Sequence, residues 1–168
     1  MRPSSPGAPR PPAPARDFSG AVHGSLLAAS VIATAGALGP YPKLQLTIML
    51  ITTGLVFWLI HVYSRLVGHR LASEDLSWRQ VREEARKEWP IAEAAFPPAA
   101  AVAVSPLLDL GPNDTVWLAL GVALAGQVCW ATAAVVRAGA ARRLVVVTGA
   151  VNLLLGLVLV AMKAAVSH

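Results

Sequence analysis

Residues 44–67, LQLTIMLITTGLVFWLIHVYSRLV, form the apolar segment that decides the fold class. The segment contains no acidic residue, and its one Lys or Arg, Arg65, lies near its end. About 20 apolar residues suffice to cross the hydrocarbon core of a bilayer as an α-helix, and a helix satisfies its own backbone groups in lipid. The segment is therefore predicted to span a membrane, and His61 is an unusual residue within it.

The same pattern recurs in four further segments, at residues 19–39, 89–110, 115–136 and 144–166. The composition agrees, because 55% of the 168 residues are hydrophobic and 14% are charged, against about 25% charged in a typical soluble domain. We therefore predict an all-α integral membrane bundle of five transmembrane helices. Two alternatives stay open: the first segment could be a cleaved signal peptide, and the third, interrupted by Pro97, Pro98 and Pro106, could be re-entrant.

The segments outside these spans are polar. Residues 1–18 are rich in proline and arginine and are predicted to be a disordered cytoplasmic tail. Residues 73–88 are predicted to form a cytoplasmic amphipathic helix between spans two and three. Ser77 and Gln80 have the spacing of a capping box, and apolar residues recur on one helical face at Trp78, Val81, Ala85 and Trp89. This helix would either lie on the membrane surface or extend a neighbouring span.

The distribution of basic residues predicts the orientation. With the N-terminus in the cytoplasm, all of the 14 Lys and Arg residues except Lys43 and Lys163 fall on the cytoplasmic side, which is a strong positive-inside signal. The C-terminus is then outside, and the expected location is the plasma membrane. Lys163 is expected to extend its amine towards the outer interface. Because the membrane accounts for the net charge of +5, no nucleic-acid partner is predicted.

Three ionisable residues fall at similar depth near the cytoplasmic ends of spans one, two and three: His23, His61 and Glu93. Such residues are costly in lipid and usually face the protein interior. Two imidazoles and a carboxylate could bind a divalent transition metal or pass protons, because histidine titrates near neutral pH. The alternative is that the three residues make interhelical hydrogen bonds that hold the bundle together.

Other polar and small residues favour helix packing and capping. Two small-residue faces are predicted to pack closely, within the bundle or between protomers: Gly20, Gly24 and Ala28, and Gly121, Ala125 and Cys129. Asn152 shares a face with Gly149 and Gly156, which also favours packing. The single cysteine, Cys129, is expected to be buried, and Asp109 and Asp114 to cap a proline turn.

Two short stretches loosely resemble a known family. RDFSGAVHGS (16–25) resembles the start of the first span of vacuolar iron transporter-like proteins, with His23 near the position of that family's aspartate. IHVYS (60–64) resembles the family's Gly-Glu-Tyr-x-Ser stretch, with a histidine near the glutamate position. The resemblance implies five spans, a cytoplasmic N-terminus and the handling of divalent ions, although the family's aspartate, glutamate and methionine ligands are not matched and its metal-binding insert is far longer.

The leading functional hypothesis is transport of a small cation, a divalent metal ion or a proton, through a homo-oligomer. No resident cofactor is predicted, since a metal ion would be the substrate. No GxSxG, HExxH, GxxxxGK or GxGxxG motif is present, so the chain is not expected to be an enzyme. The alternative is a non-transporting scaffold or accessory subunit that acts through the 73–88 helix.

Overall fold

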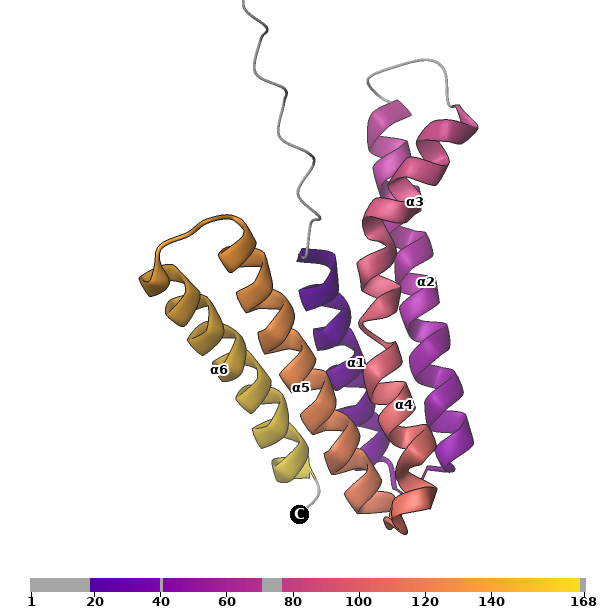
Figure 1. The fold of residues 1–168 in the computed structure, drawn as a ribbon. Coiled ribbons are helices and arrows are strands. Elements are labelled where there is room, and N and C mark those ends of the chain that lie inside the picture. The colour runs from indigo at the N-terminus through magenta and orange to yellow at the C-terminus, as the bar shows by residue number, and fades with distance from the viewer. Residues whose placement is uncertain (1–18, 40, 71–76, 167–168) are drawn as a thin grey trace, which may run out of the picture.

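The computed structural model describes residues 19–39, 41–70 and 77–166, and nearly all of them are helical (Figure 1). The elements in chain order are α1 (Ser19–Ala37), α2 (Lys43–Arg70), α3 (Trp78–Glu93), α4 (Phe96–Val104), the 3-10 helix η1 (Ser105–Leu108), α5 (Pro112–Arg137) and α6 (Arg142–Val166). The predicted tail at residues 1–18 and the start of the amphipathic segment, residues 73–76, lie outside the described residues.

Five helical stretches are long and apolar enough to cross a membrane, which confirms the predicted all-α class and five apolar spans. They run over Ser19–Ala37, Lys43–Gly68, Trp78–Leu108, Pro112–Arg137 and Arg142–Ala165. Figure 1 shows the α3–α4 stretch running alongside α2 from one end of the bundle to the other, instead of turning back. The chain is a polytopic membrane protein.

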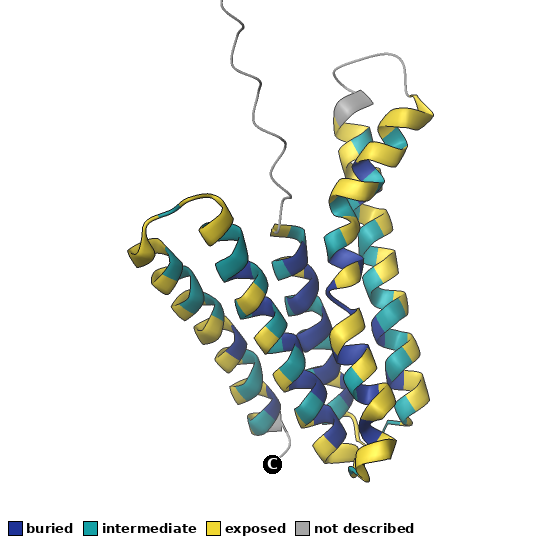
Figure 2. Ribbon diagram, viewed as in Figure 1, coloured by how far each residue is buried: buried dark blue, intermediate teal, exposed yellow. Residues whose placement is uncertain are grey.

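Helix α1 is the centre of the bundle. It packs against α2, α3, α5 and α6, whereas α6 packs chiefly against α5 and α1. The buried side of α1 is built from small residues with one larger side chain, Ile32, and these meet Ala119, Leu120 and Ala123 of α5. Figure 2 accordingly shows buried residues concentrated along α1 and the elements next to it, and few on α6.

The third span is bent at Ala94 and Ala95, which separate α3 from α4. Pro97 and Pro98 cause the bend, because proline has no N–H and so the carbonyls of the residues four positions earlier lose their helical donors. Ala95 instead donates its N–H to the carbonyl of Ala92 at 3.1 Å, which is a tighter turn than an α-helix makes. The prolines therefore bend the span without ending it.

The predicted amphipathic helix is not a separate element. Helix α3 begins at Trp78 and continues through residue 89 to Glu93, and it packs along α2 throughout. Helical hydrogen bonding continues where the apolar residues begin, so the structure agrees with the second of the two possibilities, an extension of a neighbouring span. The predicted capping box is confirmed, since Ser77 and Gln80 cap α3 reciprocally. Figure 1 shows this end of α3, with the end of α2, projecting beyond the other helices.

Of three smaller predictions, two differ from the structure and one is confirmed in part. Cys129 is exposed, not buried. Lys163 is only 3% exposed, so its side chain is enclosed by neighbouring helices instead of extending outwards; its amine lies 4.0 Å from the centre of the Trp117 ring, a cation–π contact. The capping role of Asp109 is confirmed, since it is the C-cap of η1 with φ at 53°, whereas Asp114 lies in the first turn of α5 and Gly111 is the N-cap.

Candidate functional site

Helices α1 and α2 bring His23 and His61 into contact. The two ring centroids are 5.4 Å apart, and the rings are inclined at 57°. His61 Nδ1 lies 2.9 Å from the carbonyl oxygen of Phe57, one turn earlier in α2. A carbonyl oxygen only accepts hydrogen bonds, so Nδ1 is the protonated nitrogen of neutral His61. The Nε2 atom of His61 is then the nitrogen with a lone pair, available to a proton or another ligand.

The histidine pair lies at the surface of the bundle. His23 is exposed, and His61 is half-buried. His23 is four residues into α1, which places it about 6 Å from that end of the helix. The pair therefore lies near the end of the bundle at which α1 begins, within the apolar span Ser19–Ala37.

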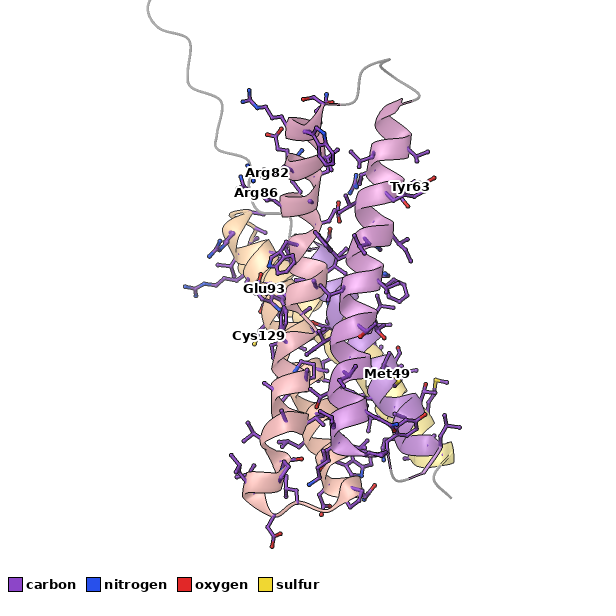
Figure 3. The ribbon with its side chains drawn as sticks, turned by 90° about the vertical axis from the view of Figure 1, so that its right-hand side faces the viewer. Met49, Tyr63, Arg82, Arg86, Glu93 and Cys129 are labelled. Carbon is purple, nitrogen blue, oxygen red and sulfur yellow. The ribbon has the colours of Figure 1, made fainter. Side chains whose placement is uncertain are left out.

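Glu93 does not join the histidines. Its side chain is exposed, and Figure 3 shows it directed away from α2, the helix that carries His61. Within residues 19–39, 41–70 and 77–166, no group of three or more His, Cys, Asp and Glu side chains could hold a metal ion. The structure thus brings together two of the three predicted site residues, and the predicted three-residue metal site is not formed by the described side chains.

The other polar residues at this end of α2 connect it to α3. Trp58 donates from Nε1 to the carbonyl of Ala85 at 2.8 Å, and its ring meets that of Trp89 edge-on with centroids 5.4 Å apart. One to two turns further on, Arg65 Nε lies 3.0 Å from Glu88 Oε1. Sequence reasoning assigned Arg65 only to the charge asymmetry and missed Glu88 as its partner.

Two glycines hold the bend of the third span between α1 and α2. A Cβ placed on Gly24 of α1 would overlap the carbonyl oxygen of Ile91, and one placed on Gly54 of α2 would lie 2.7 Å from the Cβ of Ala95. Close approach of this kind is what small residues permit between membrane helices. The predicted packing role of Gly24 is therefore confirmed, and it serves contact with α3 inside one chain. Gly24 directly follows His23, so the part of α1 that carries one of the two histidines also packs against the bend of the third span.

A second polar cluster lies between α5 and α6. Gln127 is fully buried, and its Nε2 is 3.2 Å from both the backbone oxygen and Oδ1 of Asn152. Two acceptors surround Nε2, so the amide cannot be flipped, and the opposite atom, Oε1, is buried without a described hydrogen-bond partner. Gly156 makes room for Leu124 beside this pair. The packing role predicted for the Asn152 face is thus confirmed.

The outward face of α1 carries polar side chains that sequence reasoning missed. His23 and Thr34 are exposed, Ser30 is half-buried, and the residues on the opposite face, such as Ala28 and Ile32, are buried. Spacings of seven and four residues place all three polar residues on one side of a helix. That spacing is readable from the sequence, but their outward direction is not, because the buried face of α1 also carries a hydroxyl side chain, Ser25, among its small residues.

Comparisons with known proteins do not identify the chain. No protein family, no curated protein and no solved structure matches it. The resemblance to vacuolar iron transporter-like proteins stays a prediction.

Proposed function

We propose that this membrane protein moves a small cation across the bilayer, and that the contact between His23 and His61 is its site. The observation that carries the proposal is the 5.4 Å separation of two imidazole rings contributed by different spans. Ionisable side chains at membrane depth are costly and commonly belong to ion or proton pathways. Of the two cations considered from the sequence, the proton is favoured, because two imidazoles without Glu93 lack the third ligand expected of a transition-metal site.

The bonding of His61 supports proton exchange in particular. Its Nδ1–H donates to the Phe57 carbonyl, which keeps the ring oriented and leaves Nε2 as the nitrogen that gains and loses a proton. Imidazole changes charge near neutral pH, so this nitrogen can accept a proton from one side of the pair and release it to the other. His23, being exposed, is the ring that would meet the proton donor or acceptor first.

We also propose that the protein forms a homo-oligomer through the outward face of α1. The outward face of α1 exposes His23 and Thr34, and uncovered polar groups are unfavourable against lipid. Hydroxyl groups donate and accept hydrogen bonds, so the same face of a second copy could satisfy them. Covering the face in this way would also enclose the histidine pair, which one protomer leaves open to its surroundings.

The orientation predicted from the sequence accompanies this proposal. The arginines of α3 and of the α5–α6 turn lie at the end of the bundle where α1 begins, as Figure 1 shows for these elements. Lys43 and Lys163 belong to the opposite end. We propose that the arginine-bearing end faces the cytoplasm of a plasma-membrane protein, so that the histidine pair would exchange protons with the cytoplasmic side.

Proton flux into proteoliposomes tests the function. With a pH-sensitive dye trapped inside and an imposed membrane potential, wild-type protein should acidify or alkalise the lumen faster than empty liposomes. His61→Ala should reduce this rate at least about tenfold, the loss expected of a general acid–base group, and His23→Ala should also reduce it. Glu93→Gln is the matched control, because Glu93 is exposed and apart from the pair. Equal rates for wild type and the double histidine variant would overturn the proposal.

The projecting part of α2 and α3 supports a second function, that of a scaffold. The hydrogen bond from Trp58 and the Arg65–Glu88 ion pair connect the two helices, and the tip carries Trp78 with 87% of its surface exposed. In this case Trp78→Ala combined with Arg79→Glu should abolish capture of a partner protein from the cytoplasm, and the histidine variants should not affect it. Retained capture by the tip variant would exclude the scaffold function for α3.

A further inference from the structure

Acidic and basic residues are intermixed along the sequence of α3, but the fold places Glu84 and Glu88 against neighbouring side chains. Glu84 is buried and accepts a hydrogen bond from Lys87 Nζ at 2.7 Å. Glu88 keeps only 12% of its side chain exposed and pairs with Arg65 of α2. These carboxylates are therefore held against α2 or by neighbours on α3, and they are not available to an external cation.

The arginines of α3 form the opposite face. Arg79, Arg82 and Arg86 are all exposed, and spacings of three and four residues place them on one side of the helix. Figure 3 shows Arg82 and Arg86 directed away from α2. Among the described residues, no ion pair joins Arg82 or Arg86 to an acidic side chain, including the neighbouring Glu83. We call the exposed pair Arg82 and Arg86 the arginine face.

The level of the arginine face follows from the packing of α1. Gly20, at the start of α1, packs against Ile91 of α3, so the end of the first span lies close to Ile91. Arg86 is five residues before Ile91, which places its backbone about 7 Å beyond that level, and Arg82 is about 13 Å beyond it. Each headgroup layer is about 5–8 Å thick, so in a bilayer whose hydrocarbon core ends level with the start of α1 the layer would contain Arg86, and the long side chain of Arg82 would reach its outer part.

The surface below the arginine face is suited to acyl chains. Helix α4, which follows the bend, exposes Phe96, Ala100 and Val104, and these apolar side chains offer a lipid tail a place to pack. Between Arg86 and α4, Glu93 is the one exposed carboxylate, and it lies seven residues after Arg86, or about 10 Å deeper. A phosphate placed at Arg86 is thus far from this carboxylate and next to the arginine.

We propose that the arginine face binds the phosphate of an anionic phospholipid in the adjacent leaflet. Guanidinium groups bind phosphate oxygens through paired, charge-assisted hydrogen bonds, and basic groups next to a span attract anionic lipids. The apolar surface of α4 favours a lipid over a soluble acidic ligand, because only a lipid occupies both places at once. This inference does not depend on the proton-transport proposal.

Thermal unfolding in detergent with added lipid tests the site. Phosphatidylglycerol should raise the wild-type midpoint, whereas equal amounts of phosphatidylcholine or of inorganic phosphate should not. The Arg82→Gln/Arg86→Gln variant should lose at least half of this rise. The matched control, Arg142→Gln/Arg143→Gln, removes the same charge from exposed positions at the same end of the bundle and should keep the rise.

Two results would overturn the site. If both double variants lost the rise equally, the effect would be general electrostatic attraction, not binding at the arginine face. If phosphatidylglycerol did not stabilise the wild type at all, a lipid would be excluded and an acidic protein partner would become the occupant to seek. Native mass spectrometry gives a second readout that does not depend on unfolding: the arginine-face variant should copurify with fewer phosphatidylglycerol molecules per protomer than the control.

Discussion

Replacing Gly54 with alanine should destabilise the protein through a single methyl–methyl overlap. The new Cβ would lie 2.7 Å from the Cβ of Ala95 at the bend of the third span, whereas carbon atoms in contact prefer about 3.5–4.0 Å. Helices α2 and α4 would have to separate by about 1 Å, and overpacking of this kind costs about 1–3 kcal/mol. The remaining neighbours of the Gly54 site, in Ala92, are at 3.6 Å or more, so Ala95 alone is responsible.

The compensating variant makes the prediction specific. Ala95→Gly removes the opposing methyl group, so the pair Gly54→Ala/Ala95→Gly should be more stable than the sum of the single changes by at least about 1 kcal/mol, which is within the usual range for residues in contact. Reversible unfolding in SDS mixed micelles, followed by tryptophan fluorescence, measures these free energies. Gly121→Ala is the control, because nothing lies within 4 Å of its added Cβ. Additive single effects, or Gly54→Ala as stable as Gly121→Ala, would refute this account of the bend.

Three further variants can be measured in the same unfolding assay. Gly24→Ala should cost more than Gly54→Ala, because its methyl meets a backbone carbonyl that no side-chain change can remove; recovery of stability by a side-chain deletion would contradict this. Trp58→Phe should cost about 0.5–1.5 kcal/mol for the lost hydrogen bond, and Trp78→Phe, at an exposed position, should cost nothing measurable. Gln127 and Asn152 should show a coupling of about 0.6–2 kcal/mol in a double-mutant cycle, and zero coupling would exclude their hydrogen bond.

The spans could be predicted because a single physical requirement determines them. A backbone in lipid has to satisfy its own hydrogen bonds, so a run of about 20 apolar residues such as 44–67 can be read as a helix without knowledge of its neighbours. For residues 73–88 the sequence left two structures open, and the described part, from residue 77 on, extends a neighbouring span. Polarity marks where lipid ends, but helical hydrogen bonding continues past that point, and α3 runs on to Glu93.

The candidate site was predicted only in part, because the depth of a residue does not determine the direction in which it points. The sequence predicts similar depth for His23, His61 and Glu93 on three helices, and within the part of the chain that the structure describes the two histidines meet without Glu93. In a soluble protein, the polar face of a helix shows which side faces water and therefore how the helix is rotated about its own axis. In a membrane helix, both the side that faces lipid and the side that faces the core are apolar. Cys129 was expected to be buried and is exposed for the same reason.

The space left by small residues can determine where a charged side chain lies, and rules based on charge alone do not predict that position. Lys163 was expected to extend towards the interface, as charged residues near the ends of spans commonly do. Instead, Gly36 of α1 leaves room for its side chain, whose Cε lies 3.1 Å from the place where a Cβ would be. Its amine then lies over the Trp117 ring. A sequence shows both the glycine and the tryptophan, but not that three different helices bring them to the same lysine.

The bend of the third span connects packing to the proposed site. Gly24 follows His23 directly in α1, and Gly54 precedes His61 by about two turns in α2. The helices that hold the bend are thus the helices that carry the two imidazoles. Any change that pushes α1 away from the Ile91 carbonyl also moves His23 relative to His61, since a helix shifts as a rigid unit over a single turn. A bend relaxed on one side is therefore expected to change the separation of the two imidazole rings.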